Sequence, residues 1–354
     1  MNKPSGSIYD KRNGQKLRSI GTMKKANWGK EVIKLLTFII LFYAAEVAVF
    51  CLFGTEISSW SRRILNQMYQ SEPIEIGVIG GSQVLYGVSP SIIEEKTGKA
   101  TANLTSSQQP LTAADAILRE TVKNHPEMKE VYVSLDYSLV MAEEINLESI
   151  YMVADAMPVS LNRLRYLYHA TPQDYYLNSM LPLRKGESYS FSMDQIRKNL
   201  DVLCEWNYRE KVSAGGFAPH DGMDLDTWNG LQEEYTVKSE HLTEENGRVL
   251  LPERSEWAIR DMVCFCKKQG IRIVFFATPV PEFVTDSVNN YEKYADAVCR
   301  LLKEVGGEEY LDFNLISFDR KNTEYYNDDF HLSGMGAEAF TVELCDAIAS
   351  SVRK

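Results

Sequence analysis

The chain has 354 residues and a formal net charge of −11 at pH 7, with 44 % hydrophobic and 11 % aromatic residues. This composition is typical of a packed globular protein of one large or two ordinary domains, and it excludes a disordered chain. Residues 1–34 carry nine lysines and arginines against two acidic residues, which leaves a charge of −18 for residues 35–354. Because nucleic-acid phosphates must be neutralised by Lys and Arg, the acidic body argues against nucleic-acid binding.

An apolar run of 20 residues, LLTFIILFYAAEVAVFCLFG (35–54), follows the basic stretch. About 20 apolar residues are what a helix needs to cross a bilayer, and no small-residue cleavage pattern follows the run. A buried core helix is the alternative, but the basic flank and the abrupt end match the positive-inside rule. We therefore expect a cytoplasmic tail at 1–34, a transmembrane signal anchor at 35–54 and an extracytoplasmic domain at 55–354.

Glu46 is an ionisable residue within this apolar run. A carboxyl group at membrane depth is costly, and such groups usually face a polar partner inside the bilayer. One interpretation is that Glu46 contacts another membrane protein. The other is that a single carboxyl is tolerated there, either protonated or reached by water.

Five short β-rich runs follow, and helical patterns separate or follow most of them. The expected strands are 75–80, 100–104, 130–136, 271–277 and 310–313. The expected helices are 89–97, 111–125, 255–269, 286–305 and 334–352. Strands that alternate with helices, each strand a continuous apolar run, predict a parallel sheet covered on both faces. The expected fold class is therefore α/β.

Local signals mark the ends of two of these helices. Ser89 followed by Pro90 is typical of an N-cap with proline at the first helical position, and Gly98 is typical of a helix stop. Thr112, with Asp115 three residues on, resembles a capping box at the start of the next helix.

Residues 141–254 interrupt the alternation with a long segment rich in Tyr and Trp. An insertion of this size between two strands of one sheet is more often a cap over the site than a structureless loop. Its aromatic side chains could stack on sugar rings, but a place in the core of the cap is the more frequent outcome. The aromatic residues concerned are Tyr166, Tyr168, Tyr175, Tyr176, Trp206 and Trp228.

The stretch IEIGVIGGSQVLYGVSP (74–90) places Ser82 directly after an apolar strand and two glycines, Gly80 and Gly81. In an open parallel sheet reactive groups lie where strands end, and the two glycines permit a sharp turn. The motif differs from the G-x-S-x-G elbow of α/β-hydrolases, because Val84 stands where that motif has glycine. On its own, the pattern fits a structural turn as well as a nucleophile.

A nucleophilic serine needs a base, and the base needs an orienting group. Of the five histidines, His331 stands just before the last expected helix, in YYNDDFHLSGMGAEAF, and Asp328 precedes it by three residues. An Asp-x-x-His pair on one turn can place a carboxylate against the imidazole Nδ1 and leave Nε2 free for a serine hydroxyl. A helix-capping or surface histidine is the alternative.

In combination, four blocks resemble the SGNH/GDSL hydrolase superfamily: Gly-x-Ser after the first strand, NLTSSQQPL after the second, VSLDYS at the end of the third, and DDFHL before the last helix. The resemblance covers about 75–140 and 256–350, and it implies a flavodoxin-like three-layer α/β/α fold. The first two blocks are most similar to membrane-anchored bacterial members, related to the teichoic-acid D-alanyl-transfer protein and to alginate-type O-acetylation proteins.

Carried over residue by residue, the resemblance implies Ser82 as the nucleophile, Asp328 as the orienting acid and His331 as the base. Gln108 stands where many members have a glycine whose N–H helps to bind the oxyanion. A backbone N–H serves this purpose whatever the side chain, provided that the local backbone allows it.

Two further residues are expected to support the site. Asp136 is the residue nearest to the asparagine of the third block, and a carboxylate cannot donate a hydrogen bond unless it is protonated. We therefore expect Asp136 to orient Ser82 or the turn, and Gly81 to support the turn. These departures fit a specialised acyl-transfer site better than generic ester hydrolysis.

The residues and the resemblance together favour a membrane-anchored serine acyltransferase or esterase that modifies a cell-envelope polysaccharide or teichoic acid, beside a membrane-bound O-acyltransferase. Two alternatives stay open: a non-catalytic glycan-binding partner of such an acyltransferase, and a deacylase without a partner. The sequence holds no metal-ligand constellation, and GVIGGS lacks the ending of a Walker motif. We expect no metal and no cofactor.

Overall fold

The computed structural model describes residues 28–142, 146–181, 189–204, 216–306, 310–316 and 318–351. Within them, a five-stranded parallel sheet has the order β2–β1–β3–β6–β7. Its strands are β1 (Ile76–Ile79), β2 (Thr101–Asn103), β3 (Glu130–Ser134), β6 (Arg272–Ala277) and β7 (Tyr310–Asp312). This order is that of the flavodoxin-like doubly wound sheet, so the expected fold class and strands are confirmed.

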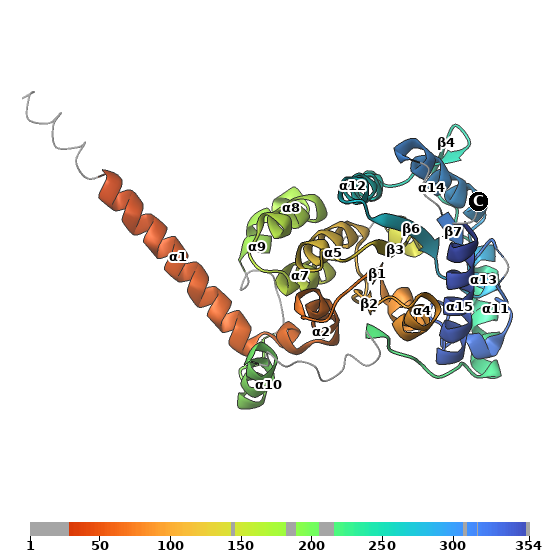
Figure 1. Cartoon of the computed structure of the whole chain (residues 1–354), viewed down its shortest axis with the longest axis horizontal. Coiled ribbons are helices and arrows are strands. Elements are labelled where there is room, and N and C mark those ends of the chain that lie inside the picture. Colours follow the sequence, from red (N-terminus) through yellow and green to blue (C-terminus); the bar gives the residue numbers. More distant parts are fainter. Residues whose placement is uncertain are drawn as a thin grey trace, which may run out of the picture.

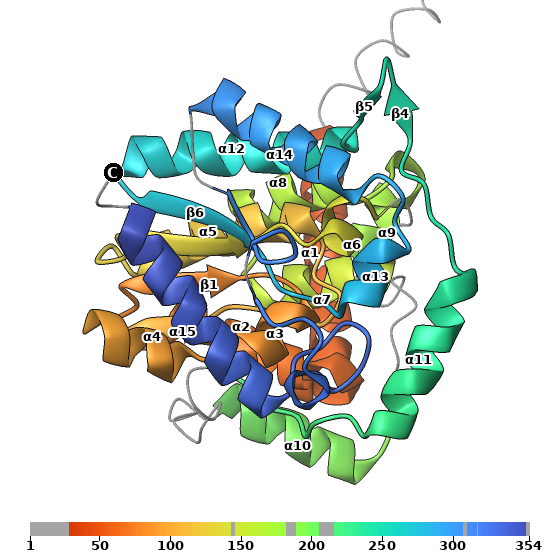
Figure 2. The same ribbon diagram turned by 90° about the vertical axis from the view of Figure 1, so that its right-hand side faces the viewer.

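Helices cover both faces of the sheet (Figure 1). One face carries α3 (Ser82–Gly87), α4 (Pro90–Thr97) and α15 (Gly334–Ser351). The other carries α5 (Leu111–Asn124), α12 (Glu253–Gln269) and α14 (Tyr291–Val305). Figure 2 shows β6 between α12 and α15, which gives the three layers of the molecule.

The strand side chains alternate between the two layers, as the pleat of a β-strand requires. In β3, Val131 and Val133 lie in the core under α5 and α12, whereas Tyr132 lies in the core under α15. In β6, Phe275 and Phe276 divide in the same way. Because both faces are buried, the strands read as continuous apolar runs in the sequence.

The ends of α4 follow the local signals, but the start of α5 does not. The N-cap of α4 is Ser89, and its C-cap, Gly98, has a left-handed φ of 70°. The expected capping box at Thr112 is wrong, because α5 begins one residue earlier, after Pro110. Asp115 is buried inside α5 and forms ion pairs there, with Arg119 and Arg165.

The described helices of the inserted segment 141–254 pack against separate parts of the protein and form no single cap. Its helices are α7 (Leu147–Ala156), α8 (Leu161–Ala170), α9 (Tyr176–Met180), α10 (Met193–Cys204) and α11 (Leu225–Val237). Helices α7 and α8 pack on α5, and α7 also packs on α2 (Trp60–Leu65). Helix α10 packs on α1 (Trp28–Phe53), and α11 packs on α13 (Glu282–Asp286). A short ribbon of β4 (Glu244–Glu245) and β5 (Arg248–Val249) precedes α12.

The aromatic residues of the insertion divide between core and surface. Tyr166 and Trp228 are buried, whereas Tyr168 and Tyr175 are exposed. Tyr168 also stacks on Tyr176. Trp206 lies outside the described residues.

Helix α1 projects from the body (Figure 1). Within the described residues it is the one helix that is long and apolar enough to cross a membrane. It covers the expected span 35–54 except for Gly54, and it begins before residue 35; the basic residues 1–27 lie outside the described residues. Residues 28–42 are exposed.

The C-terminal part of α1 is packed against the body. Glu46 is only 3 % exposed, and Asn199 of α10 donates hydrogen bonds to the carbonyls of Leu52 and Gly54, at 3.1 and 2.9 Å. Contact of Glu46 with a second membrane protein therefore stays a prediction. Such a partner would approach a part of α1 that this chain already covers.

Candidate active site

Ser82 is the first residue of α3, a short helix that begins directly at the end of β1 and that the sequence did not indicate. A Cβ at Gly80 would collide with Val84 and lie 2.9 Å from Ser134 Cβ, so the close packing of the strand end requires glycine there. Gly81 has a φ of −86°, and nothing lies within 4 Å of the place of its Cβ. The steric need for glycine therefore holds at Gly80 and not at Gly81.

The structure brings together the three residues that the sequence proposed for the chemistry. Ser82 Oγ lies 2.8 Å from His331 Nε2, and His331 Nδ1 lies 2.8 Å from Asp328 Oδ2 and 3.0 Å from Asp328 Oδ1. A carboxylate only accepts hydrogen bonds, so His331 carries its proton on Nδ1. Nε2 is then free to accept the proton of the Ser82 hydroxyl.

The hydrogen bonds around Asp328 favour its charged form. Its Oδ1 accepts the backbone N–H groups of Phe330 and His331, both at 2.8 Å. Partial burial tends to raise the pKa of this carboxyl, but the hydrogen bonds from the His331 ring and from the Phe330 N–H bring the pKa below its ordinary value. Asp328 is therefore a carboxylate at neutral pH and can hold the imidazole.

The loop 327–331 carries the acid and the base of the site. Contacts at its two ends and at Asp329 hold it in place. Tyr326 and Leu332 form an antiparallel bridge where the loop begins and ends. Tyr235 of α11 donates a hydrogen bond of 2.7 Å to Asp329. The inserted segment thus helps to position this loop.

Gln108 has the backbone that a glycine usually supplies. Its φ is 50°, in the left-handed region that residues with a Cβ rarely adopt. The Asn146 side-chain amide donates a hydrogen bond to Gln108 Oε1. In the described part of the chain, the N–H groups of Ser82 and Gln108 make no hydrogen bond, and both residues line the same cavity. The backbone thus leaves two N–H donors available near the nucleophile.

Asp136 connects two strand ends beside the site. Its Oδ1 accepts hydrogen bonds from the Thr278 N–H at 2.8 Å and the Thr278 hydroxyl at 2.6 Å, and its Oδ2 accepts one from Ser134. Complete burial raises the pKa of Asp136 to about 6, although these hydrogen bonds act in the opposite direction. Of the two expected roles, these contacts fit the orientation of the turn.

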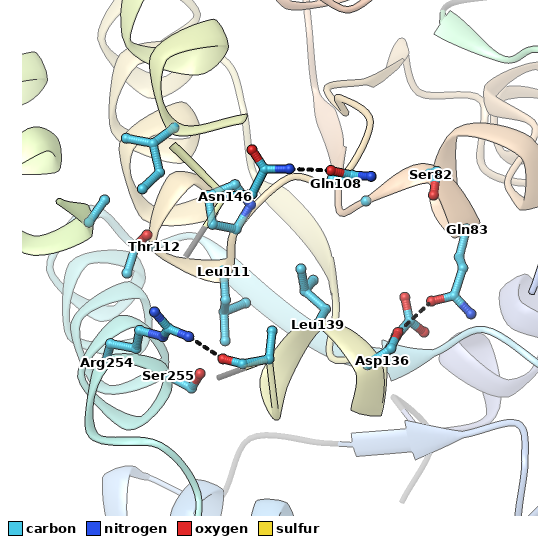
Figure 3. Close-up of a pocket in the computed structure, with 16 residues that line it drawn as sticks. Ser82, Gln83, Gln108, Leu111, Thr112, Asp136, Leu139, Asn146, Arg254 and Ser255 are labelled. Atoms are coloured by element: carbon cyan, nitrogen blue, oxygen red, sulfur yellow. Dashed lines mark hydrogen bonds between the residues drawn. The ribbon is translucent and has the colours of Figure 1, made fainter. Parts of the chain in front are cut away.

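A cavity of 270 Å³ begins at Ser82 (Figure 3). Most of its lining residues were not singled out from the sequence, among them Gln83, Asn146 and Arg254. Asn146 and Arg254 stand at the beginning and end of the inserted segment, where it leaves β3 and returns to α12. Their position at helix starts was the available signal, because Asn146 is the N-cap of α7 and Arg254 is the second residue of α12.

Two more rings lie beside the base. Tyr86, one turn after Ser82 on α3, meets the His331 ring edge to face at a centroid distance of 5.1 Å. The exposed His220 ring lies 4.1 Å from the Tyr86 ring. Because a helix begins at Ser82, residue 86 lies on the same face as the nucleophile.

Comparison with known proteins gives no family assignment. No protein-family model matches the chain, and no curated protein sequence matches it. The resemblance to the SGNH/GDSL superfamily therefore rests on the four sequence blocks.

Two solved structures are similar to the chain at low identity. One, from Streptococcus pneumonia, is provisionally described as a platelet activating factor; it is 12 % identical, covers 90 % of this chain and 98 % of its own, and has a TM-score of 0.35. The other, from Bacteroides fragilis, is provisionally described as an acylhydrolase; it is 12 % identical, covers 83 % and 98 %, and has a TM-score of 0.38. The fold is therefore argued from the strand order, and the chemistry from the site geometry.

Proposed function

We propose that the protein is a membrane-anchored serine acyltransferase or esterase of the SGNH type, acting on a cell-envelope polysaccharide or teichoic acid. The observation that carries the chemistry is the chain of contacts from Ser82 Oγ through His331 to Asp328. A serine hydroxyl is a weak nucleophile until an oriented base takes its proton, and this arrangement supplies both base and orienting group.

In the first half-reaction, Ser82 Oγ attacks the carbonyl carbon of an acyl donor while His331 Nε2 takes the hydroxyl proton. The electron pair of the carbonyl moves onto its oxygen, and the N–H groups of Ser82 and Gln108 bind that oxyanion. When the bond to the leaving oxygen breaks, His331 returns the proton to it. The product is an acyl-Ser82 ester.

In the second half-reaction, a hydroxyl of the acceptor attacks the acyl-Ser82 ester, and His331 takes its proton. The bond between the acyl carbon and Ser82 Oγ then breaks, and His331 Nε2 returns the proton to Ser82 Oγ. The acceptor must therefore approach from the side of His331. The ring pair of Tyr86 and the exposed His220 lies on that side and offers apolar surface to a sugar or polyol. Water in place of the acceptor gives hydrolysis.

The proposed location is the outer face of a cell membrane, with α1 as anchor and the basic residues 1–34 in the cytoplasm. An exposed tryptophan supports a membrane-spanning role for α1, because Trp28, its first residue, is 74 % exposed. Trp and Tyr side chains gather at the membrane–water interfaces of spanning helices. In this location the protein would work beside a membrane-bound O-acyltransferase.

The decisive experiment is covalent labelling of the full chain, in detergent, with a small serine-reactive fluorophosphonate, followed by peptide mapping. We expect one adduct, on Ser82, and none in Ser82→Ala. In His331→Ala the rate should fall by about 10²-fold or more, because general-base assistance contributes about 10²–10⁴.

Ser138→Ala is a matched control, because Ser138 also lines the cavity but has no base beside it in the described residues. It should label like the native chain. A folded native protein that takes no label, while free serine hydrolases in the same buffer do, would exclude the acyl-serine proposal. The next hypothesis to test would then be that the protein is a non-catalytic, glycan-binding partner of an acyltransferase.

A further inference from the structure

The cavity at Ser82 extends away from the base, toward the start of α12. At one end it is lined by Ser82, Gln83 and Gln108, and at the other by Thr112 and Arg254, with apolar side chains between (Figure 3). His331 contacts Ser82 but is not among the described residues that line the cavity. Ser82 therefore lies between the cavity and the side that carries the base.

Most of the surface that the described lining residues present to the cavity is apolar, although nine of these sixteen residues are polar. The apolar lining residues are Pro110, Leu111, Leu139, Ala142, Ile150 and Ala170. The described lining contains no aromatic ring on which a sugar could stack. Such a surface suits an alkyl chain and offers a glycan little.

Three polar side chains that line the cavity away from Ser82 are engaged with the protein itself. Arg254 donates a hydrogen bond to the backbone carbonyl of Ala142, and Ser255 Oγ donates one of 2.7 Å to the carbonyl of Val140. Asn146 donates to Gln108 and accepts a hydrogen bond of 3.1 Å from the Ser149 N–H. These groups therefore present less polarity to a ligand than their residue types suggest.

The volume indicates the size of the occupant. An apolar cavity of about 150 Å³ takes up benzene, with its six carbon atoms. The present cavity, at 270 Å³, is nearly twice as large. It exceeds the need of an acetyl group and accommodates an unbranched chain of about six to ten carbon atoms.

We propose that this cavity is the acyl-binding subsite and that Ser82 carries a medium-chain acyl group. This inference rests on the proposed function, because it needs Ser82 as the nucleophile. The carbonyl carbon bonds to Ser82 Oγ at the mouth of the cavity, the alkyl chain lies along Leu111, Leu139 and Ile150, and the donor's leaving group departs with the proton from His331. The acceptor then enters on the side of His331, which the chain does not occupy.

The test is the acyl-chain profile of the full-length protein in detergent micelles, measured with p-nitrophenyl acetate, butyrate, octanoate and dodecanoate. Each buried methylene contributes up to about fourfold in kcat/KM. We expect octanoate to exceed acetate by at least about tenfold. Comparing variants on the same ester in the same detergent cancels the partition of long esters into micelles.

Two substitutions should move the profile in opposite directions. Ala170→Leu fills the cavity and should lower the octanoate-to-acetate ratio by about tenfold. Ile150→Ala enlarges it and should raise the dodecanoate-to-octanoate ratio. Ala156→Leu is the control, because Ala156 is as buried as Ala170, at 6 % against 5 % exposed, and does not line the cavity. It should leave the profile unchanged.

The outcomes separate this inference from the proposed function. If no ester reacts and Ser82 takes no label, the proposed function itself is wrong. If Ser82 labels and acetate is turned over at least as well as octanoate, the acyl subsite is wrong and the proposed function stands. Equal shifts in Ala170→Leu and Ala156→Leu would also overturn the subsite, because they would reflect general loosening of the fold.

Discussion

The backbone of Gln108 has a φ of 50°, a conformation that costs a residue with a Cβ about 1 kcal/mol or more and that glycine adopts freely. Strained residues persist where the surrounding structure holds them, and here the Asn146 amide holds the Gln108 side chain. Strain of this kind is concentrated at functional sites. We infer that the position is used for its backbone N–H, which the side chain leaves accessible.

Substitution of Gln108 tests this inference. Gln108→Pro removes the N–H and forces φ to about −65°, so fluorophosphonate labelling of Ser82 should slow by about 10²–10³, the usual effect of one lost oxyanion donor. Gln108→Gly keeps both the N–H and the left-handed φ, and it should label at least about tenfold faster than the proline variant. Equal rates in the two variants would show that this N–H does not bind the oxyanion.

At the scale of elements, Asp136 joins the ends of β3 and β6 through Ser134 and Thr278. A buried carboxyl whose pKa is about 6 holds its proton more tightly in the folded chain than in the unfolded chain, where the pKa is about 3.9. The stabilisation from this proton is fully present below about pH 4 and is lost as the pH rises through about 6. At neutral pH the buried Asp136 carboxyl is ionised, and its burial then lowers the stability of the folded chain.

Asp136→Asn should remove this pH dependence. An amide keeps an acceptor for Thr278 and donates to the Ser134 hydroxyl, so the geometry survives without the charge. The free energy of unfolding of the variant, relative to the native chain, should increase by about 2–3 kcal/mol between about pH 4 and pH 7. Urea unfolding at the two pH values measures the difference. A constant difference would mean that Asp136 ionises normally in the folded state.

The parts of the molecule that could be predicted are those with local signals. The strands are short apolar runs bounded by turns, and the proximity of Ser82, Asp328 and His331 follows from strand ends that meet at one edge of a parallel sheet. The acyl cavity could not be predicted, because Asn146 and Ala170 reach it only through the packing of the inserted helices on α5. No periodic pattern encodes such a contact.

Tertiary packing also overturned one local signal. Asp115 has the spacing of a capping residue, but it is drawn into ion pairs with Arg119 and with Arg165, which is 50 residues away. The burial of Glu46 also could not be predicted from the local sequence. Its place in an apolar run follows from the sequence, whereas its burial depends on how α1 packs against the body, which includes α10, a helix more than a hundred residues later.

At the scale of the whole molecule, Asn199 is one of the residues that join α1 to the body. This residue is fully buried, and its amide satisfies the carbonyls of Leu52 and Gly54 at the end of α1. A helix end leaves carbonyls without intrahelical partners, so these two hydrogen bonds both end the helix and join it to α10.

Asn199→Leu should loosen this junction. Removal of the amide leaves two carbonyls without their donor, at a cost of about 1–3 kcal/mol to the local structure. Amide hydrogen exchange of residues 50–58 should therefore become about tenfold faster or more. Turnover of p-nitrophenyl esters should be unchanged, because Asn199 lies in neither the cavity lining nor the proton relay. Unaltered exchange in a folded variant would show that other contacts hold the junction.

In the proposed location at a membrane, this junction makes α1 a rigid support and not a flexible tether. An enzyme on a flexible tether explores a wide volume above the membrane and meets any acceptor within reach. An enzyme on a rigid support keeps its nucleophile at one height and one orientation. The protein would then choose among hydroxyl groups by their distance from the bilayer as well as by their chemistry, and modify a narrow band of a long polymer.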